Sequence, residues 1–147
     1  MVKDIPARIY PVGRLDRDSE GLLIMTNDGD FANKVIHPSH DIGKTYRVTV
    51  KSSITEEQLT GLCIGPEIDG KPTAPAIVEV ISEASDRTVL EITIKEGRNR
   101  QIRKMCELVG LEVTRLKRKS IGNVKLGMLG VGKWRNLSAQ EIKVLSK

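Results

Sequence analysis

The chain has 147 residues, of which 39% are hydrophobic and 29% are charged, and its 24 Lys and Arg against 19 Asp and Glu give a net charge of +5. No apolar run approaches the roughly 18 residues of a transmembrane helix, and no basic and then apolar opening indicates a signal peptide. Two cysteines cannot build a disulfide framework, which favours a reducing compartment. We therefore expect a single cytoplasmic domain, without membrane contact, over residues 1–147.

The first third of the chain predicts two short strands and one helix. Residues 8–12 and 21–26 are apolar and strand-like, and a polar loop separates them. Asp28 or Asp30 is placed to cap the helix that follows, which Pro38 ends.

The middle of the chain alternates between strand and helix signals. Residues 46–50 alternate in polarity with period two, which is typical of a strand. Thr55, with Gln58 three residues later, forms a capping box that begins a helix. Asp69-Gly70 predicts a tight turn.

A hairpin, a helix and a basic strand are predicted next. Residues 76–82 and 88–95 are strand-like and are joined by a polar turn. Residues 98–109 carry apolar side chains at helical spacing, and Gly110 stands where a helix commonly ends. Residues 113–121 predict a strand rich in Arg and Lys.

The last segment predicts one more strand, at residues 134–137, and a terminal helix capped by Ser138. Strands outnumber helices and do not alternate strictly with them. The sequence therefore predicts an α+β fold with a mixed, largely antiparallel sheet and flanking helices.

Basic residues cluster in two runs, at residues 95–104 and 115–119, which together hold nine of the 24 Lys and Arg. Clustering of this kind suits a phosphate backbone, because each neutralised phosphate releases a counterion. A solvated charged face is the alternative that charge alone leaves open.

The polar loop at residues 13–21 concentrates three acids and two arginines between two apolar strands. Nearby guanidinium groups can hold a carboxylate ionised, and a partly desolvated Asp can act as a nucleophile or base. On spacing alone, solvated turn residues are the simpler interpretation.

Other candidate chemistry is weak. His37 and His40 form an H-x-x-H pair without enough neighbouring ligands for a metal, so no metal site is predicted. Cys63 and Cys106 lie on apolar helix faces, where packing is the expected role. No phosphate-binding glycine motif is present.

Four segments, in order, carry a resemblance to a known family. They are GRLDRDSEGLL at 13–23 followed by TNDG at 26–29, KTYRV at 44–48, EGRNRQIRKM at 96–105, and a closing segment from Leu116 through Trp134-Arg135. Together they resemble the pseudouridine synthases, in particular the branch that modifies ribosomal RNA and includes small subunit synthase A and large subunit synthase B. The similarity runs from about Ile9 to the C-terminus.

The resemblance implies a role for three catalytic residues. Asp16 is expected to be the carboxylate that attacks or deprotonates the target nucleotide. Tyr46 is expected to stack on the target uracil and to take part in the proton transfer at C5. Arg103 is expected to pair with Asp16, which keeps that carboxylate ionised and aimed.

Substrate-binding residues follow from the same motifs. Arg14 is expected to contact the RNA backbone beside the flipped nucleotide. The residues expected to contact RNA or support the cleft are Arg98, Asn99, Arg100 and Gln101.

The resemblance further implies isomerisation of a specific uridine in ribosomal RNA, with large-subunit RNA favoured and no cofactor needed. Relatives usually carry an N-terminal RNA-binding domain of the S4 type and an opening strand that this sequence lacks, so the expected domain is partial. A missing central strand predicts an exposed sheet edge and self-association. The alternative is a non-catalytic RNA-binding fragment of such an enzyme.

Overall fold

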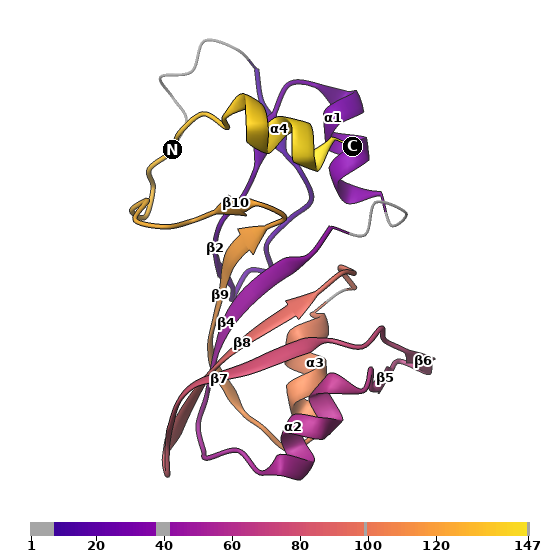
Figure 1. Ribbon diagram of the computed structural model, residues 1–147, viewed down its shortest axis with the longest axis vertical. Helices are drawn as coiled ribbons and strands as arrows, with labels where there is room; N and C mark the ends of the chain where they lie inside the picture. The colour runs from indigo at the N-terminus through magenta and orange to yellow at the C-terminus, as the bar shows by residue number, and fades with distance from the viewer. Residues whose placement is uncertain (1–7, 38–41, 99, 147) are drawn as a thin grey trace.

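The computed structural model of the chain describes residues 8–37, 42–98 and 100–146 (Figure 1). Their helices are α1 (Gly29–Ile36), α2 (Glu56–Cys63), α3 (Gln101–Leu108) and α4 (Ala139–Leu145). Their strands are β1 (Tyr10–Pro11), β2 (Glu20–Gly21), β3 (Met25–Thr26), β4 (Lys44–Val50), β5 (Glu67–Ile68), β6 (Lys71–Pro72), β7 (Ile77–Ala84), β8 (Arg87–Ile94), β9 (Val113–Ile121) and β10 (Val124–Lys125).

The main sheet has the order β10-β9-β4-β8-β7, with antiparallel neighbours throughout. β2 adds a short parallel pairing to β9, and β1-β3 and β5-β6 form small antiparallel ribbons. The predicted α+β fold with a mixed, largely antiparallel sheet is confirmed.

Two hydrophobic cores lie toward opposite ends of the sheet. One packs α2 and α3 against the sheet and includes the fully buried Leu62, Leu90 and Met105. The other gathers Phe31 of α1 and Leu145 of α4 with residues from the ends of β9 and β10. Figure 1 shows α2 and α3 at one end of the molecule and α1 and α4 at the other. Each fully buried large aliphatic side chain contributes roughly 1.5–3 kcal/mol to folding.

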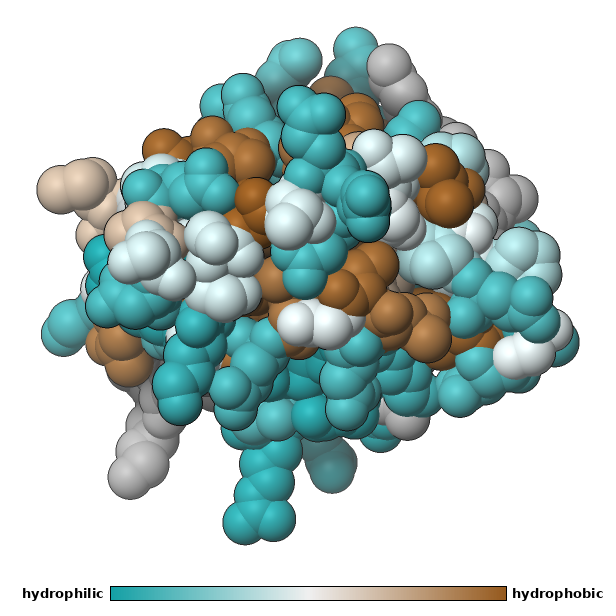
Figure 2. Space-filling view, turned by 90° about the horizontal axis from the view of Figure 1, so that it is seen from below, coloured by the Kyte–Doolittle hydropathy of each residue, from teal (hydrophilic) through white to brown (hydrophobic). Residues whose placement is uncertain are grey.

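The surface at the α2 end is largely hydrophilic, with groups of hydrophobic residues showing between the hydrophilic ones (Figure 2). In the described ranges, no helix combines the length and apolar character that crossing a membrane requires.

Strand register extends one core face into a polar region. On β4, Val48 lies opposite Leu116 of β9, and both are buried. Two residues earlier, Tyr46 lies opposite Arg118 on the same strands. Side chains two residues apart share a face of a strand, so Lys44 continues this row. The face of the sheet that carries the buried Val48 and Leu116 therefore carries polar side chains near the start of β4 and the end of β9.

Local signals predicted the starts of α1, α2 and α4 correctly. The Asp28 carboxylate accepts hydrogen bonds from two backbone amides at the start of α1, and a capping box opens both α2, at Thr55, and α4, at Ser138. Gly110 follows α3 with a φ of +81°, a left-handed conformation that glycine adopts without strain.

The hairpin and turn predictions are confirmed as well. β7 and β8 pair antiparallel across a turn of two residues, Ser85 and Asp86. Asp69 and Gly70 join β5 to β6, and both have positive φ, as a tight hairpin turn requires.

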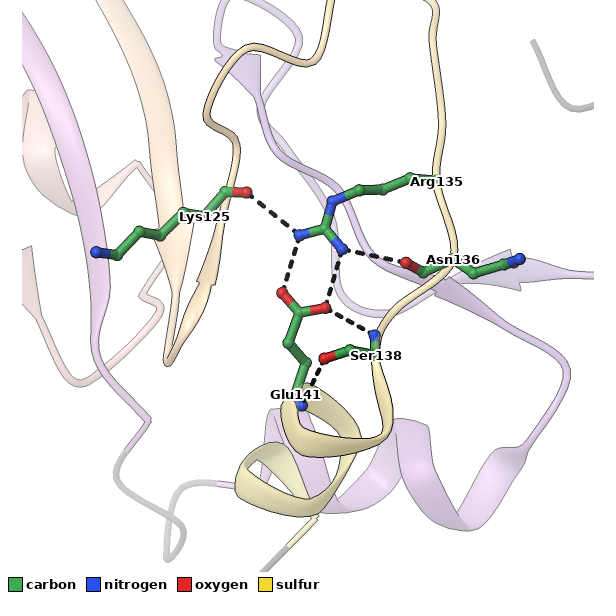
Figure 3. Close-up of polar contacts among 5 residues, drawn as sticks. All are labelled: Lys125, Arg135, Asn136, Ser138 and Glu141. Carbon is green, nitrogen blue, oxygen red and sulfur yellow. Dashed lines mark hydrogen bonds and ion pairs between the residues drawn. The ribbon is translucent and has the colours of Figure 1, made fainter.

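Three predicted strands are wrong in extent or existence. Of residues 8–12, only Tyr10 and Pro11 form a strand, β1. Residues 21–26 do not form one strand, because the chain changes partner within them: the Leu22 amide donates to Arg118 of β9, whereas Ile24 accepts from Val12 beside β1. Residues 134–137 form no strand. There the Arg135 side chain donates to the backbone carbonyl of Asn136 (Figure 3).

The helix predicted over residues 98–109 is shorter, because Arg100 adopts a left-handed φ of +52° and α3 begins after it. The predicted end of α1 at Pro38 lies outside the described residues; the helix ends at Ile36, with His37 as its C-cap.

Gly21 is required where β2 meets β9. Its φ is +118°, and a Cβ at this position would collide with the backbone of Arg118. Because both the conformation and the close approach exclude a side chain, glycine here holds the polar loop against the sheet.

Candidate active site

A cavity of about 830 Å³ lies between the polar loop, the end of α1, β4, and the segment that leads into α3. Asp16 and Tyr46, thirty residues apart in the sequence, both line it. Its volume falls within the roughly 300–1,000 Å³ typical of ligand pockets. The structure thus brings together two of the three residues that the family resemblance assigned to catalysis, and Arg103 is not among the residues that line the cavity.

Tyr46 stands where the buried core meets the cavity. It is half-buried and packs against the core beneath the sheet while lining the cavity. A ring supported on one side by packed aliphatic groups and open on the other can stack on a planar base at little further entropic cost.

The polar loop is anchored to α3 by Asp18. Arg100 donates to both Asp18 carboxylate oxygens, at 2.9 and 3.0 Å. Arg103 donates to the Asp18 backbone carbonyl at 2.7 Å, and its Nε lies 3.4 Å from the carboxylate. These contacts hold the loop against residues that follow it by more than eighty positions in the sequence.

The expected pairing of Arg103 with Asp16 is therefore wrong. Arg103 contacts Asp18, two residues later in the loop, and does not line the cavity. The reason is geometric: the loop turns after Asp16, whose carbonyl accepts the Ser19 amide at 2.9 Å, and this turn presents Asp18 to α3. Arg103 is thus a positioning residue for the loop.

Asp18 is held ionised by its partners. The hydrogen bond from Arg100 is the largest cause that lowers the pKa of the Asp18 carboxyl, and the same bond raises the pKa of the Arg100 guanidinium. Asp16 makes no hydrogen bond or ion pair through its side chain with any residue in the described ranges. Its carboxylate is available to a ligand in the cavity.

Arg98 and Gln101 line the cavity but are already engaged. The Arg98 guanidinium donates to the carbonyls of Ile68, Lys71 and Pro72, which ties the β5-β6 ribbon to the cavity wall. Gln101 is 3% exposed. It accepts the Arg98 amide and donates to Glu96 at 2.9 Å. Both therefore support the cleft, one of the two roles expected of this group.

The remaining predicted binding residues differ in their placement. Arg14 and Arg100 line the cavity and are exposed. Asn99 lies outside the described residues. The cavity wall is cationic overall, with six basic side chains and two acidic ones: Arg14, Lys44, Lys95, Arg98, Arg100 and Arg118 against Asp16 and Glu96.

Some basic residues of the two runs are neutralised by acidic partners. Lys104 pairs with Asp69 at 2.8 Å, and Arg115 pairs with Glu20 at 2.5 Å. These two ion pairs neutralise charge at basic residues that do not line the cavity.

Sequence reasoning assigned no role to Lys44 or Arg118, although both lie in the quoted motifs and both line the cavity. Strand periodicity contained the signal for Lys44, since it stands two residues before Tyr46 and so shares its face. Nothing local predicts Arg118, because its place opposite Tyr46 depends on the register of β9 against β4.

The structure describes both cysteines and one of the two histidines considered as metal ligands. Cys106 is buried in the core, and burial raises the pKa of its thiol to about 12, so packing is its role. Cys63 is half-buried. His40 lies outside the described residues, and within those ranges no three His, Cys, Asp or Glu side chains come together as metal ligands.

Comparisons with known proteins identify a family for this chain. A family model described as RNA pseudouridylate synthase matches residues 3–108. The chain is 45% identical over 145 residues to the ribosomal large subunit pseudouridine synthase B of Bacillus subtilis (strain 168), covering 97% of this chain and 59% of that protein. It is 44% identical over 140 residues to the dual-specificity RNA pseudouridine synthase RluF of Escherichia coli (strain K12), covering 95% and 47%.

A solved structure gives the same result for the fold. A crystal structure of pseudouridylate synthase matches with a TM-score of 0.86 at 34% identity, over 93% of this chain and 59% of that chain. The chain spans about half to three fifths of the length of these relatives. From the matched family model and these identities, the chain belongs to the RNA pseudouridylate synthase family.

Proposed function

We propose that this chain isomerises a specific uridine of ribosomal RNA to pseudouridine, with large-subunit RNA as the substrate. The observation that carries the proposal is the shared cavity of Asp16 and Tyr46, which also has a cationic wall. Family membership and the relative named for the large ribosomal subunit support the same reaction and substrate.

The reaction balances without any added group. The N1–C1′ bond of uridine breaks, the base turns, a C5–C1′ bond forms, and the proton leaves C5 while N1 gains one. The Asp16 carboxylate either attacks C1′ to form a covalent adduct or takes a sugar proton to give a glycal. Tyr46 holds the detached uracil by stacking, which tolerates rotation of the base in its plane.

The cavity wall supplies the binding energy. A uridine in folded RNA must leave its stack, at a cost of a few kcal/mol that contacts with phosphates and the pocket offset. Arg14 and Arg100 are exposed at the cavity and suit phosphate contact. Asp18, paired with Arg100 and Arg103, keeps the loop that carries Asp16 in place.

The proposal is tested by tritium release from a ribosomal RNA transcript labelled at C5 of uridine. The parent chain should release tritium, and Asp16→Asn should lower the rate by more than about 10³-fold while RNA retention stays close to that of the parent. Asp86→Asn is the matched control, because Asp86 is an exposed carboxylate in the β7–β8 turn, away from the cavity.

The two candidate roles of the chain separate in this assay. Binding of the transcript without tritium release identifies a non-catalytic RNA-binding module. Release that survives in Asp16→Asn rejects the assignment of the carboxylate. Absence of both binding and release rejects the proposed function.

Self-association and a cytoplasmic location belong to the same proposal. β7 is an edge strand of the main sheet and exposes Ile77 and Ile81. It also carries Glu79, Glu83 and a bulge between Val80 and Ser82, features that oppose edge pairing in natural sheets. Light scattering at high protein concentration tests the prediction: a dimer supports it, and a clean monomer contradicts it.

A further inference from the structure

The deep wall of the cavity carries two cationic side chains that the proposed chemistry does not use. Lys44 comes from β4 and Arg118 from the adjacent β9, and their strands place them on the face that carries Tyr46. Both line the same cavity as Asp16.

Arg118 is buried and only partly satisfied. It is 4% exposed, and its Nε donates to the Leu22 carbonyl at 2.9 Å. Its Nη2 is buried and has no hydrogen-bond partner. A buried guanidinium nitrogen without an acceptor is costly, so its retention at a cavity wall points to an acceptor that arrives with a ligand.

Lys44 lies close enough to Arg118 for their charges to repel. Burial, and then the charge of Arg118, lowers the pKa of the Lys44 ammonium. Within the described ranges, the Lys44 ammonium makes no hydrogen bond or ion pair, and the Arg118 guanidinium makes no ion pair. Two like charges held together in this way favour a shared anion between them.

The acids of the cavity do not fill this place. Glu96 accepts the Ala74 amide and the Gln101 amide, and Asp16 pairs with neither cation. The missing acceptor must therefore bring several oxygens and negative charge, which a phosphodiester does.

We infer that Lys44 and Arg118 together bind the backbone phosphate of the nucleotide that enters the cavity. This inference rests on the proposed function, because it adds a phosphate-binding site for the RNA substrate of that function. Anchoring the phosphate on β4 and β9 sets the position of the attached ribose relative to Asp16. Lys44 and Arg118 are thus substrate-positioning residues, distinct from the exposed Arg14 and Arg100.

A substitution at Gly97 can move the Lys44 ammonium without replacing Lys44 itself. An added Cβ at Gly97 would lie 2.9 Å from the Lys44 Nζ. Since the conflicting atom is the end of a flexible side chain, Gly97→Ala should displace the ammonium without changing the net charge.

The test measures transcript affinity across a range of salt concentrations. Lys44→Gln should weaken binding about tenfold and reduce the slope of log affinity against log salt by about 0.7 to 1, because one ion pair with phosphate is lost. Gly97→Ala should reduce the slope in the same direction. Lys51 is an exposed lysine just after the far end of β4, and Lys51→Gln should leave the slope at the parental value.

Arg118 is tested with a fold check. Arg118→Met should reduce the slope as Lys44→Gln does, and Arg118→Lys should restore part of it; thermal unfolding of each variant shows that it is folded. Equal slopes for Lys44→Gln, Lys51→Gln and the parent overturn the inference.

A second readout does not depend on the enzyme's substrate. Inorganic phosphate titrated into the parent should shift the side-chain NMR signals of Lys44 and Arg118, and Lys44→Gln should abolish the shift at Arg118. The absence of a shift in the parent overturns the phosphate-binding site. If the parent shows this shift but neither binds nor modifies the transcript, the phosphate-binding site stands and the proposed function is rejected.

Discussion

Charged side chains are treated in opposite ways at the cavity and at the start of α4. At α4, Arg135 donates to both Glu141 oxygens, at 2.8 and 2.9 Å, and the Ser138 amide donates to the same carboxylate (Figure 3). In the cavity, neither Asp16 nor Lys44 forms a side-chain ion pair with any described residue. Charge that only holds the fold is matched during folding, whereas charge that awaits a ligand stays unmatched.

The polar loop shows the same contrast within nine residues. Asp18 is paired twice, with Arg100 and Arg103, whereas Asp16 faces the cavity. The paired carboxylate of Asp18 gives the loop its position, and we propose that the unpaired carboxylate of Asp16, two residues earlier, acts in catalysis. Four measurements on variants and the parent test these assignments.

The largest expected effect on stability is at Gly21. Gly21→Ala places a Cβ against the Arg118 backbone in a conformation that non-glycine residues avoid, so we expect a loss of about 3 kcal/mol or more. Urea unfolding measures it. Gly70→Ala, where φ is also positive but nothing lies within 4 Å, is the control for conformation alone and should cost less. Equal losses for the two variants would show that the contact with β9 is unimportant.

Arg103 comes next. Arg103→Met removes a hydrogen bond to the Asp18 carbonyl from a side chain that is only 16% exposed, so we expect a loss of about 1–2 kcal/mol together with slower tritium release. Arg100→Met, at 42% exposure, should affect stability less. If Arg103→Met has the parental melting temperature and rate, the anchoring role is wrong.

The Arg135 pair should affect stability alone. Arg135→Met breaks the contacts with Glu141 and the carbonyls shown in Figure 3, at a cost of up to about 1 kcal/mol for a partly exposed pair. Transcript binding and tritium release by the folded protein should stay parental. Loss of activity at full folding would remove the distinction between the two regions.

The smallest effect is a pH dependence. The Arg135 hydrogen bond, and then the Ser138 amide, lowers the pKa of the Glu141 carboxyl from 4.5 to about 2. A lowered pKa adds stability that is fully present above pH 4.5 and is lost as the pH falls toward 2. Unfolding free energies of the parent and Arg135→Met should therefore converge across that window. Parallel curves would contradict the pairing.

Local chemistry predicted much of the fold. The capping residues Asp28, Thr55 and Ser138 bond to neighbours within three positions, so a short stretch of sequence contains the whole signal. The bounds of the strand at 113–121 agree with the prediction, and the hairpin before α3 is confirmed with strand ends that differ by one or two residues.

Long-range pairing explains what the sequence did not predict. The division of residues 21–26 into β2 and β3 depends on which strand each residue pairs with. The partner of Arg103 depends on how the polar loop turns in space. The family motifs predicted roles for Asp16 and Tyr46. The structure adds Lys44 and Arg118 to the cavity wall, and the place of Arg118 depends on the register of β9 against β4.

The most direct test of the account compares two carboxylates that stand two residues apart. Tritium release from C5-labelled ribosomal RNA is measured for Asp16→Asn and Asp18→Asn under identical conditions. The account predicts no detectable turnover for Asp16→Asn and a slowed but measurable rate for Asp18→Asn, because only the first residue faces the cavity. Turnover that persists in Asp16→Asn and disappears in Asp18→Asn would contradict it.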